Sequence, residues 1–102
     1  CIRDRPYDLL LTPMLPYPAW PVDGYPANEA GELVTSPFER NPFSYPFNMT
    51  GQPAASVPCG FTSDGLPVAL QIVGKWHCDR AVLQAAAAFE LAQPWANQWP
   101  AL

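Results

Sequence analysis

Side chains that could serve as nucleophile or metal ligand gather in one short segment. His77 is the only histidine of the chain, Cys78 follows it directly, and Asp79 comes next. A cysteine near a histidine suggests thiolate chemistry, and with Cys59 or Asp79 the pair offers ligands that zinc accepts. Sequence neighbours point in different directions on a regular element, however, and no Cys-x-x-Cys or His-x₃-His spacing is present. Unreactive buried thiols are the commoner case, so we predict no metal and no cofactor.

Two other short patterns carry chemistry in some proteins. Asn48-Met49-Thr50 matches a glycosylation acceptor, but its apolar neighbours indicate burial. Prolines 13, 16, 18 and 21 match proline-rich ligand motifs, which makes a non-catalytic proline-rich interaction module the alternative function. Lys75 is the only lysine and has no serine-rich motif nearby, so we do not assign it as a catalytic base.

An aromatic segment offers a third candidate site. Phe38, Asn41 and Tyr45 would share one face of a short helix, since they are spaced by three and four residues. Pro42 is tolerated in a first helical turn, whereas Pro46 limits or kinks the helix. Packing in a core and contact with a ligand both explain such a stripe.

The elements that must position these residues are predicted to include both strands and helices. The apolar run at 7–12, closed by Pro13, is typical of a strand buried on both faces in a largely parallel sheet. A hairpin is expected over 54–73, because Asp64-Gly65 is a turn signal before residues that alternate with period two.

A helix follows the hairpin. Its alanine-rich sequence predicts a helix over 79–93, with Asp79 as N-cap and Pro94 as its end. The long proline-rich stretch at 13–36 lacks the periodic apolar pattern of a helix or a strand, and we predict a loop there. The sequence therefore predicts an α/β fold.

Composition restricts the classes of partner. Five basic residues against nine acidic ones disfavour nucleic acid and anionic membranes, and no apolar run is long enough to span a membrane. An odd number of cysteines, three, indicates a reducing, cytoplasmic location. The stretch from Asn41 to Ser63 carries no charge, which is unusual for a small free-standing domain. We therefore expect a piece of a larger protein, with self-association of the isolated chain through uncovered edges and apolar faces.

Three segments resemble the C-terminal region of amidase signature family enzymes. Residues 48–60 match the family pattern Asn-x-(Thr/Ala)-Gly-x-Pro-Ala-x-Ser-x-Pro-x-Gly. Residues 64–74 match Gly-Leu-Pro-(Val/Ile)-Gly-Leu-Gln, with Ala69 in place of a glycine. Residues 7–13 resemble the family's Asp-x-Leu-Leu-x-Pro strand, and Phe89-Glu90 falls where the family's last helix carries its Glu.

This resemblance implies a particular role for the chain. It implies that 1–102 is the C-terminal part of a larger amidase domain, with a mixed sheet flanked by helices and with 13–36 as a loop inside it. The implied enzyme hydrolyses small carboxylic amides with a Ser–cis-Ser–Lys triad carried by its N-terminal portion, the expected partner. The chain alone lacks that triad and is predicted to be inactive, contributing scaffold and substrate pocket but no catalytic residue.

The resemblance also assigns pocket residues. Positions seven and three before Asn48 line the family's substrate channel, and they fall on Asn41 and Tyr45, with Phe38 one turn earlier. In glutamine-using members of the family, the position that matches Asn41 carries an Asp, which can hold the substrate's ammonium group. Neutral Asn41 cannot supply that ion pair, so an apolar or aromatic amide is expected instead.

Overall fold

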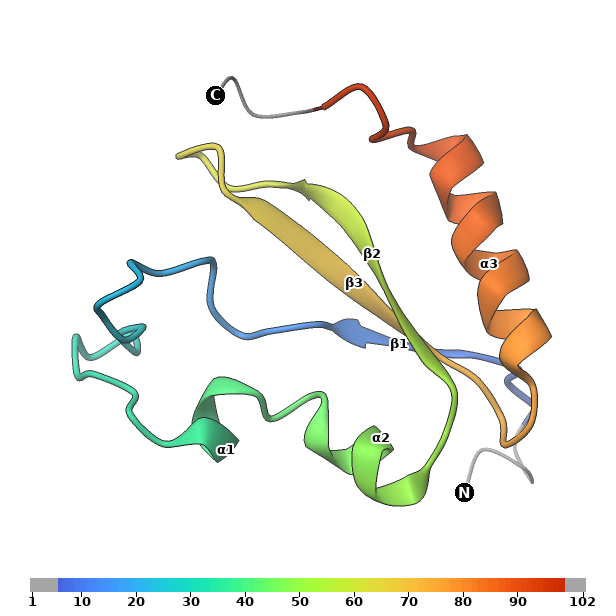
Figure 1. The fold of residues 1–102 in the computed structure, drawn as a ribbon, viewed down its shortest axis with the longest axis horizontal. Helices are drawn as coiled ribbons and strands as arrows, with labels where there is room; N and C mark the ends of the chain where they lie inside the picture. Colours follow the sequence, from blue (N-terminus) through green and yellow to red (C-terminus); the bar gives the residue numbers. More distant parts are fainter. Residues whose placement is uncertain (1–5, 99–102) are drawn as a thin grey trace.

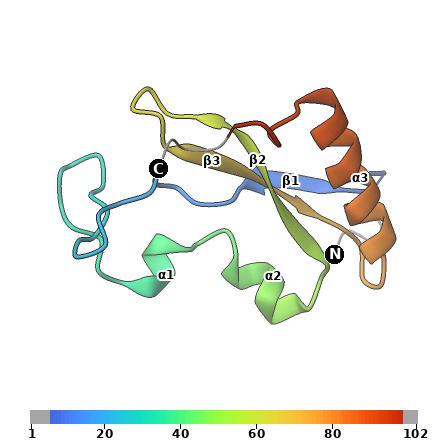
Figure 2. The same ribbon diagram turned by 45° about the horizontal axis from the view of Figure 1, so that its top comes forward.

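The computed structural model describes residues 6–98 and places a small antiparallel sheet between two helical layers. The three strands lie in the order β1-β3-β2 (Figure 1). Helix α3 covers one face of the sheet, and the short helices α1 and α2 lie on the other (Figure 2). The elements are β1 (Leu10–Pro13), α1 (Pro37–Arg40), α2 (Tyr45–Thr50), β2 (Ala54–Phe61), β3 (Pro67–Val73) and α3 (Asp79–Ala92).

The predicted hairpin is confirmed. β2 and β3 pair antiparallel over their length, and the turn closes with a hydrogen bond from the Thr62 N–H to the Leu66 carbonyl oxygen (2.8 Å). Gly65 adopts φ +82° in this turn, a conformation that favours glycine. The register shifts between Pro58 and Gly60, which marks a bulge in β2.

The first strand differs from its prediction. It spans Leu10–Pro13 instead of 7–12, and it runs antiparallel to β3. Leu10 and Leu11 are 40% and 56% exposed, so within the described residues the strand is not buried on both faces. The sheet is antiparallel throughout the described residues, since an apolar run indicates that a strand has apolar neighbours but not the direction of the strand beside it.

The core forms where α3 packs on the hairpin. Val57, Ile72 and Val82 are buried there, and Phe89 and Trp95 pack against them from α3 and the segment that follows it. Burial of each such aliphatic side chain is worth about 1.5–3 kcal/mol. The α3 bounds agree with the predicted helix to one residue. Its N-cap, however, is Cys78 and not Asp79 as predicted, since Asp79 is already the first residue of the helix.

The proline-rich segment has little regular structure but is folded. An isolated bridge pairs Ala27 with Leu33, and the Asn28 side chain closes the turn between them. Asn28 Oδ1 accepts hydrogen bonds from the N–H groups of Ala30 (3.0 Å) and Glu32 (2.9 Å). The turn is thus ordered by its own side chain, as Asn commonly orders turns.

The molecule is flat and its core is small. Its extents are 40 × 33 × 19 Å, and its radius of gyration of 15.4 Å exceeds the ~13 Å typical of a compact domain of about 100 residues. In the described part of the chain no helix has the length and apolar character needed to cross a membrane. Among the described residues the buried apolar side chains are Val34, Val57, Ile72, Val73 and Val82, together with the ring of Pro26.

Candidate amide-binding site

The aromatic segment forms two short helices instead of one. Asn41 leaves the helical conformation (φ −128°, ψ 44°) and ends α1. It precedes Pro42, whose ring disfavours helical backbone at the residue before it. The chain re-enters a helix at α2, which has Pro46 in its first turn and ends at Gly51 in a left-handed conformation (φ +68°).

The break nevertheless brings the predicted residues together. The rings of Phe38 and Tyr45 lie with centroids 4.7 Å apart, tilted by 34°. Phe38 is 69% exposed and Tyr45 is partly buried, so the pair presents an accessible aromatic surface. Asn41 lies between them in sequence, and its Nδ2 donates a hydrogen bond to the Pro37 carbonyl oxygen (3.2 Å). These three side chains are uncharged, and two of them are aromatic.

A buried glutamine fixes this segment to the sheet. Gln71 of β3 is 3% exposed, and its Nε2 donates hydrogen bonds to Thr12 Oγ1 and to the Phe43 carbonyl oxygen, both at 2.9 Å. Phe43 lies in the link between α1 and α2. This role was not predicted from the sequence, where the only signal was a polar residue inside an alternating apolar strand.

A second set of hydrogen bonds fixes the end of α2. Trp76 Nε1 donates to the Thr50 carbonyl oxygen (2.7 Å), and Gln52 Nε2 donates to the Gly74 carbonyl oxygen (3.0 Å). The Gly74 N–H donates in turn to the Pro53 carbonyl oxygen (2.9 Å). The loop after β3 therefore holds the C-terminal end of α2, so the aromatic segment is anchored to β3 or its extension at its middle, by Phe43, and at its end, by Thr50.

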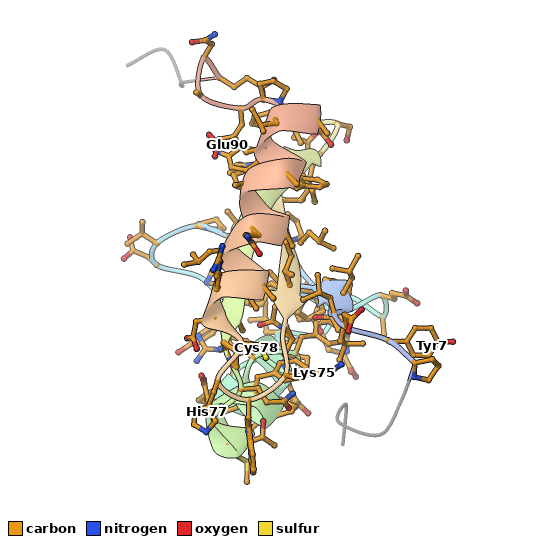
Figure 3. All side chains as sticks on the ribbon, turned by 90° about the vertical axis from the view of Figure 1, so that its right-hand side faces the viewer. Tyr7, Lys75, His77, Cys78 and Glu90 are labelled. Carbon is orange, nitrogen blue, oxygen red and sulfur yellow. The ribbon has the colours of Figure 1, made fainter. Side chains whose placement is uncertain are left out.

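The cysteine and histidine candidates lie elsewhere. Figure 3 places Lys75, His77 and Cys78 together in the turn that leads into α3. Lys75 Nζ pairs with Asp8 Oδ1 at 3.0 Å, and His77 adopts φ +61°. Cys59 lies on β2, where its thiol donates to the Val68 carbonyl oxygen (3.6 Å). Within residues 6–98 no three of the His, Cys, Asp and Glu side chains lie close enough to share a metal ion.

An apolar groove opens on the sheet face that α3 covers only in part. Its volume is about 560 Å³, and its walls come from β1, the segment after it and the hairpin. The register places Leu11 opposite Ile72 and Pro13 opposite Leu70, on the face that α3 packs against. The aromatic pair is attached to the other face through Gln71. The groove and the aromatic pair are therefore separate features.

Known proteins share the sequence pattern and the fold of this small α/β unit. The family profile described as Amidase matches residues 2–83, and this chain belongs to that family. The resemblance drawn from the sequence is thus confirmed.

Curated relatives include enzymes with different substrates. The chain is 41% identical over 96 residues to an acylamidase from Rhodococcus erythropolis. The aligned residues cover 93% of this chain and 20% of that relative. It is 38% identical over 98 residues to a subunit of the glutamyl-tRNA(Gln) amidotransferase from Thermodesulfovibrio yellowstonii, covering 93% of this chain and 19% of that protein. The chain thus spans about a fifth of the length of these relatives.

Solved structures show the same fold. A bacterial aryl acylamidase of the amidase signature family matches with a TM-score of 0.74 and 38% identity, over 93% of this chain and 20% of that one. A 6-aminohexanoate cyclic dimer hydrolase matches with a TM-score of 0.73 and 32% identity, over 87% and 20%. The predicted fold class, part of the amidase signature fold, is confirmed.

Proposed function

We propose that this chain is the C-terminal segment of an amidase that hydrolyses small carboxylic amides. It supplies scaffold and one wall of the substrate pocket, while the N-terminal portion of the enzyme supplies the Ser–cis-Ser–Lys triad. In that mechanism the serine attacks the amide carbonyl, the amine departs with a proton delivered through the triad, and water releases the acid from the acyl-enzyme. Family membership and the absence of a serine-rich motif around the single lysine support this division.

The pairing of Lys75 with Asp8 supports the same assignment. A lysine that serves as the base of such a triad must lie within hydrogen-bond reach of a serine hydroxyl, whereas the contact that the structure gives Lys75 is with a carboxylate. Lys75 Nζ lies 3.0 Å from Asp8 Oδ1, which is itself largely exposed. The only lysine of the chain thus acts as an ion-pair partner, and the chain alone is expected to hydrolyse no amide.

The pair formed by Phe38 and Tyr45 is the observation that carries the substrate assignment. Two rings with centroids 4.7 Å apart form an apolar surface, against which an aromatic or aliphatic part of a substrate can stack. The neutral Asn41 beside them offers no partner for an ammonium group. The pocket wall therefore suits an uncharged apolar or aromatic amide better than glutamine.

Location is part of the same proposal. The chain has three cysteines, of which Cys59 and Cys78 are free thiols in the structure. Free thiols persist where the compartment is reducing. We therefore propose that the amidase acts in the cytoplasm.

The test is a chimeric enzyme in which this chain replaces the matching segment of the Rhodococcus erythropolis acylamidase. We expect the chimera to hydrolyse an acyl anilide, and Phe38→Ala and Tyr45→Ala to raise KM several-fold with little change in kcat. Leu91→Ala is the matched control, because Leu91 is 83% exposed on α3. The proposal fails if the chimera folds but hydrolyses no amide, or if the aromatic variants behave like the control.

A further inference from the structure

The two short helices cannot hold the aromatic pair in place by themselves. Helix α1 has four residues and α2 has six, and helices of this length are not stable in water without support. Neither helix has a buried residue, so burial of a side chain in the core does not fix either one to the sheet. The chain also leaves the helical conformation between them, at Asn41. The position of Phe38 relative to Tyr45 therefore depends on what holds the link between α1 and α2.

Gln71 holds this link to the sheet. Its Nε2 atom donates a 2.9 Å hydrogen bond to the carbonyl oxygen of Phe43, which lies between Phe38 and Tyr45 in the sequence. Gln71 is buried, so water cannot readily replace it as the donor. Loss of this donor would free the segment between the two rings and let them move apart.

Thr12 orients the Gln71 amide. The register of β1 on β3 places the two residues directly opposite each other, so their side chains lie on the same face of the sheet. The same Nε2 atom donates to Thr12 Oγ1 at 2.9 Å. A side-chain amide nitrogen carries two hydrogens, and Thr12 and Phe43 take one each. The hydrogen bond within the sheet thus directs the second hydrogen toward the Phe43 carbonyl.

We propose that Gln71 is a positioning residue of the substrate pocket and that Thr12 assists it by orienting its amide. Through Phe43 the two residues hold Phe38 and Tyr45 at the spacing at which a substrate ring can stack on them. They thereby lower KM for aromatic amides without touching the substrate. This inference rests on the proposed function, because it assigns a role in the pocket that the aromatic pair forms.

A change in KM distinguishes positioning from a contribution to stability alone. A variant that is only less stable contains less folded enzyme, so its apparent kcat falls while its KM stays the same. In the chimeric acylamidase, Gln71→Met should raise KM for acetanilide by about two- to tenfold with little change in kcat, a range that corresponds to the ~0.5–1.5 kcal/mol of a contact between aromatic rings. Gln84→Met, at an exposed position of α3, is the control and should leave KM unchanged.

Two further comparisons identify the route of the effect. KM for acetamide, which has no ring to stack, should change little in Gln71→Met, and an equal rise for both amides would overturn the proposal. Thr12→Val removes the acceptor hydroxyl and should raise KM for acetanilide, whereas Thr12→Ser keeps a hydroxyl and should behave nearly as the unaltered chimera. A rise in Thr12→Ser as large as that in Thr12→Val would overturn the role assigned to Thr12.

A double-mutant cycle shows whether Gln71 acts through the rings. In the Phe38→Ala background the stacking surface is already lost, so adding Gln71→Met should raise KM for acetanilide no further. Independent effects, in which the two factors multiply, would overturn the proposal. A Gln71→Met variant with a reduced kcat and an unchanged KM would overturn it as well.

A measurement on the chain itself separates this inference from the proposed function. Ring protons of Phe38 and Tyr45 should give a nuclear Overhauser effect, because the ring centroids lie 4.7 Å apart. The effect should weaken in Gln71→Met and persist in Gln84→Met, and an unchanged effect in Gln71→Met overturns the proposal. If the effect weakens but the unaltered chimera hydrolyses neither amide, the result supports the positioning of the rings by Gln71 and counts against the amidase function.

Discussion

Gln71 donates a 2.9 Å hydrogen bond to the carbonyl oxygen of Phe43, a residue 28 positions earlier in the chain. The same Nε2 group donates to Thr12 Oγ1. One buried amide thus connects three parts of the chain: β1, β3 and the link between the two short helices. The position of the aromatic pair relative to the sheet depends on this side chain.

Replacing Gln71 with Met should loosen the aromatic segment. Met has a similar length but no donor, so the Phe43 carbonyl and the Thr12 hydroxyl lose their partner in a buried place. The free energy of unfolding should fall by about 1–3 kcal/mol, measured by urea denaturation. In the Gln71→Met variant, hydrogen exchange of the amides of residues 37–50 should also become faster, whereas exchange in α3 should change less. Gln84→Met on the exposed side of α3 is the control, and equal stability of the two variants would contradict the assigned role.

Gly74 leaves no room for a side chain. A Cβ atom built on Gly74 would lie 2.6 Å from Val82 Cγ2, so Gly74→Ala forces either the buried valine or the loop to move. We expect a loss of about 1–3 kcal/mol in the free energy of unfolding. Combining it with Val82→Ala should cost less than the sum of the two single changes, because the deleted methyl groups make space. Additive losses in this double-mutant cycle would show that the contact is unimportant.

The lack of charge at Asn41 should influence substrate selection. In the chimeric acylamidase, Asn41→Asp adds a carboxylate beside the aromatic pair. Relative kcat/KM should shift by several-fold toward amides that carry an ammonium group, compared with neutral amides of the same size. Asn41→Ser, which removes the amide without adding charge, separates the electrostatic effect from the lost hydrogen bond to Pro37. The same preference in both variants would exclude a role for charge at this position.

Arg40 should connect α1 to the proline-rich segment. Its guanidinium lies 5.3 Å from the centre of the Tyr25 ring, and its buried Nε atom has no hydrogen-bond partner among residues 6–98. A double-mutant cycle with Arg40→Met and Tyr25→Leu should give a coupling energy of about 0.5–1 kcal/mol. Arg40→Lys should retain most of it, because the lysine ammonium also binds an aromatic face. Zero coupling would mean that the two side chains are merely adjacent.

The sequence pattern was sufficient to predict those elements whose turn and end signals lie within a few residues of one another. The hairpin at 54–73 follows from Asp64-Gly65 and from the period-two strand after it. The helix α3 follows from its alanines and from Pro94. The division of the aromatic segment into α1 and α2 also has a local cause, since Asn41 precedes Pro42. A single helix was predicted there because proline is also tolerated in a first helical turn.

Some features could be settled only by contacts between distant residues. The antiparallel direction of β1 depends on its partner β3, about 60 positions later, and an apolar run carries no information on direction. The role of Gln71 likewise depends on Thr12 and Phe43 meeting at one point. The sequence alone determined the family, the hairpin and α3, because these depend on short motifs and local backbone preferences. Only the tertiary structure decided that Phe38 and Tyr45 pair across a helix break and that β1 lies open at the sheet edge, because both depend on how remote segments pack.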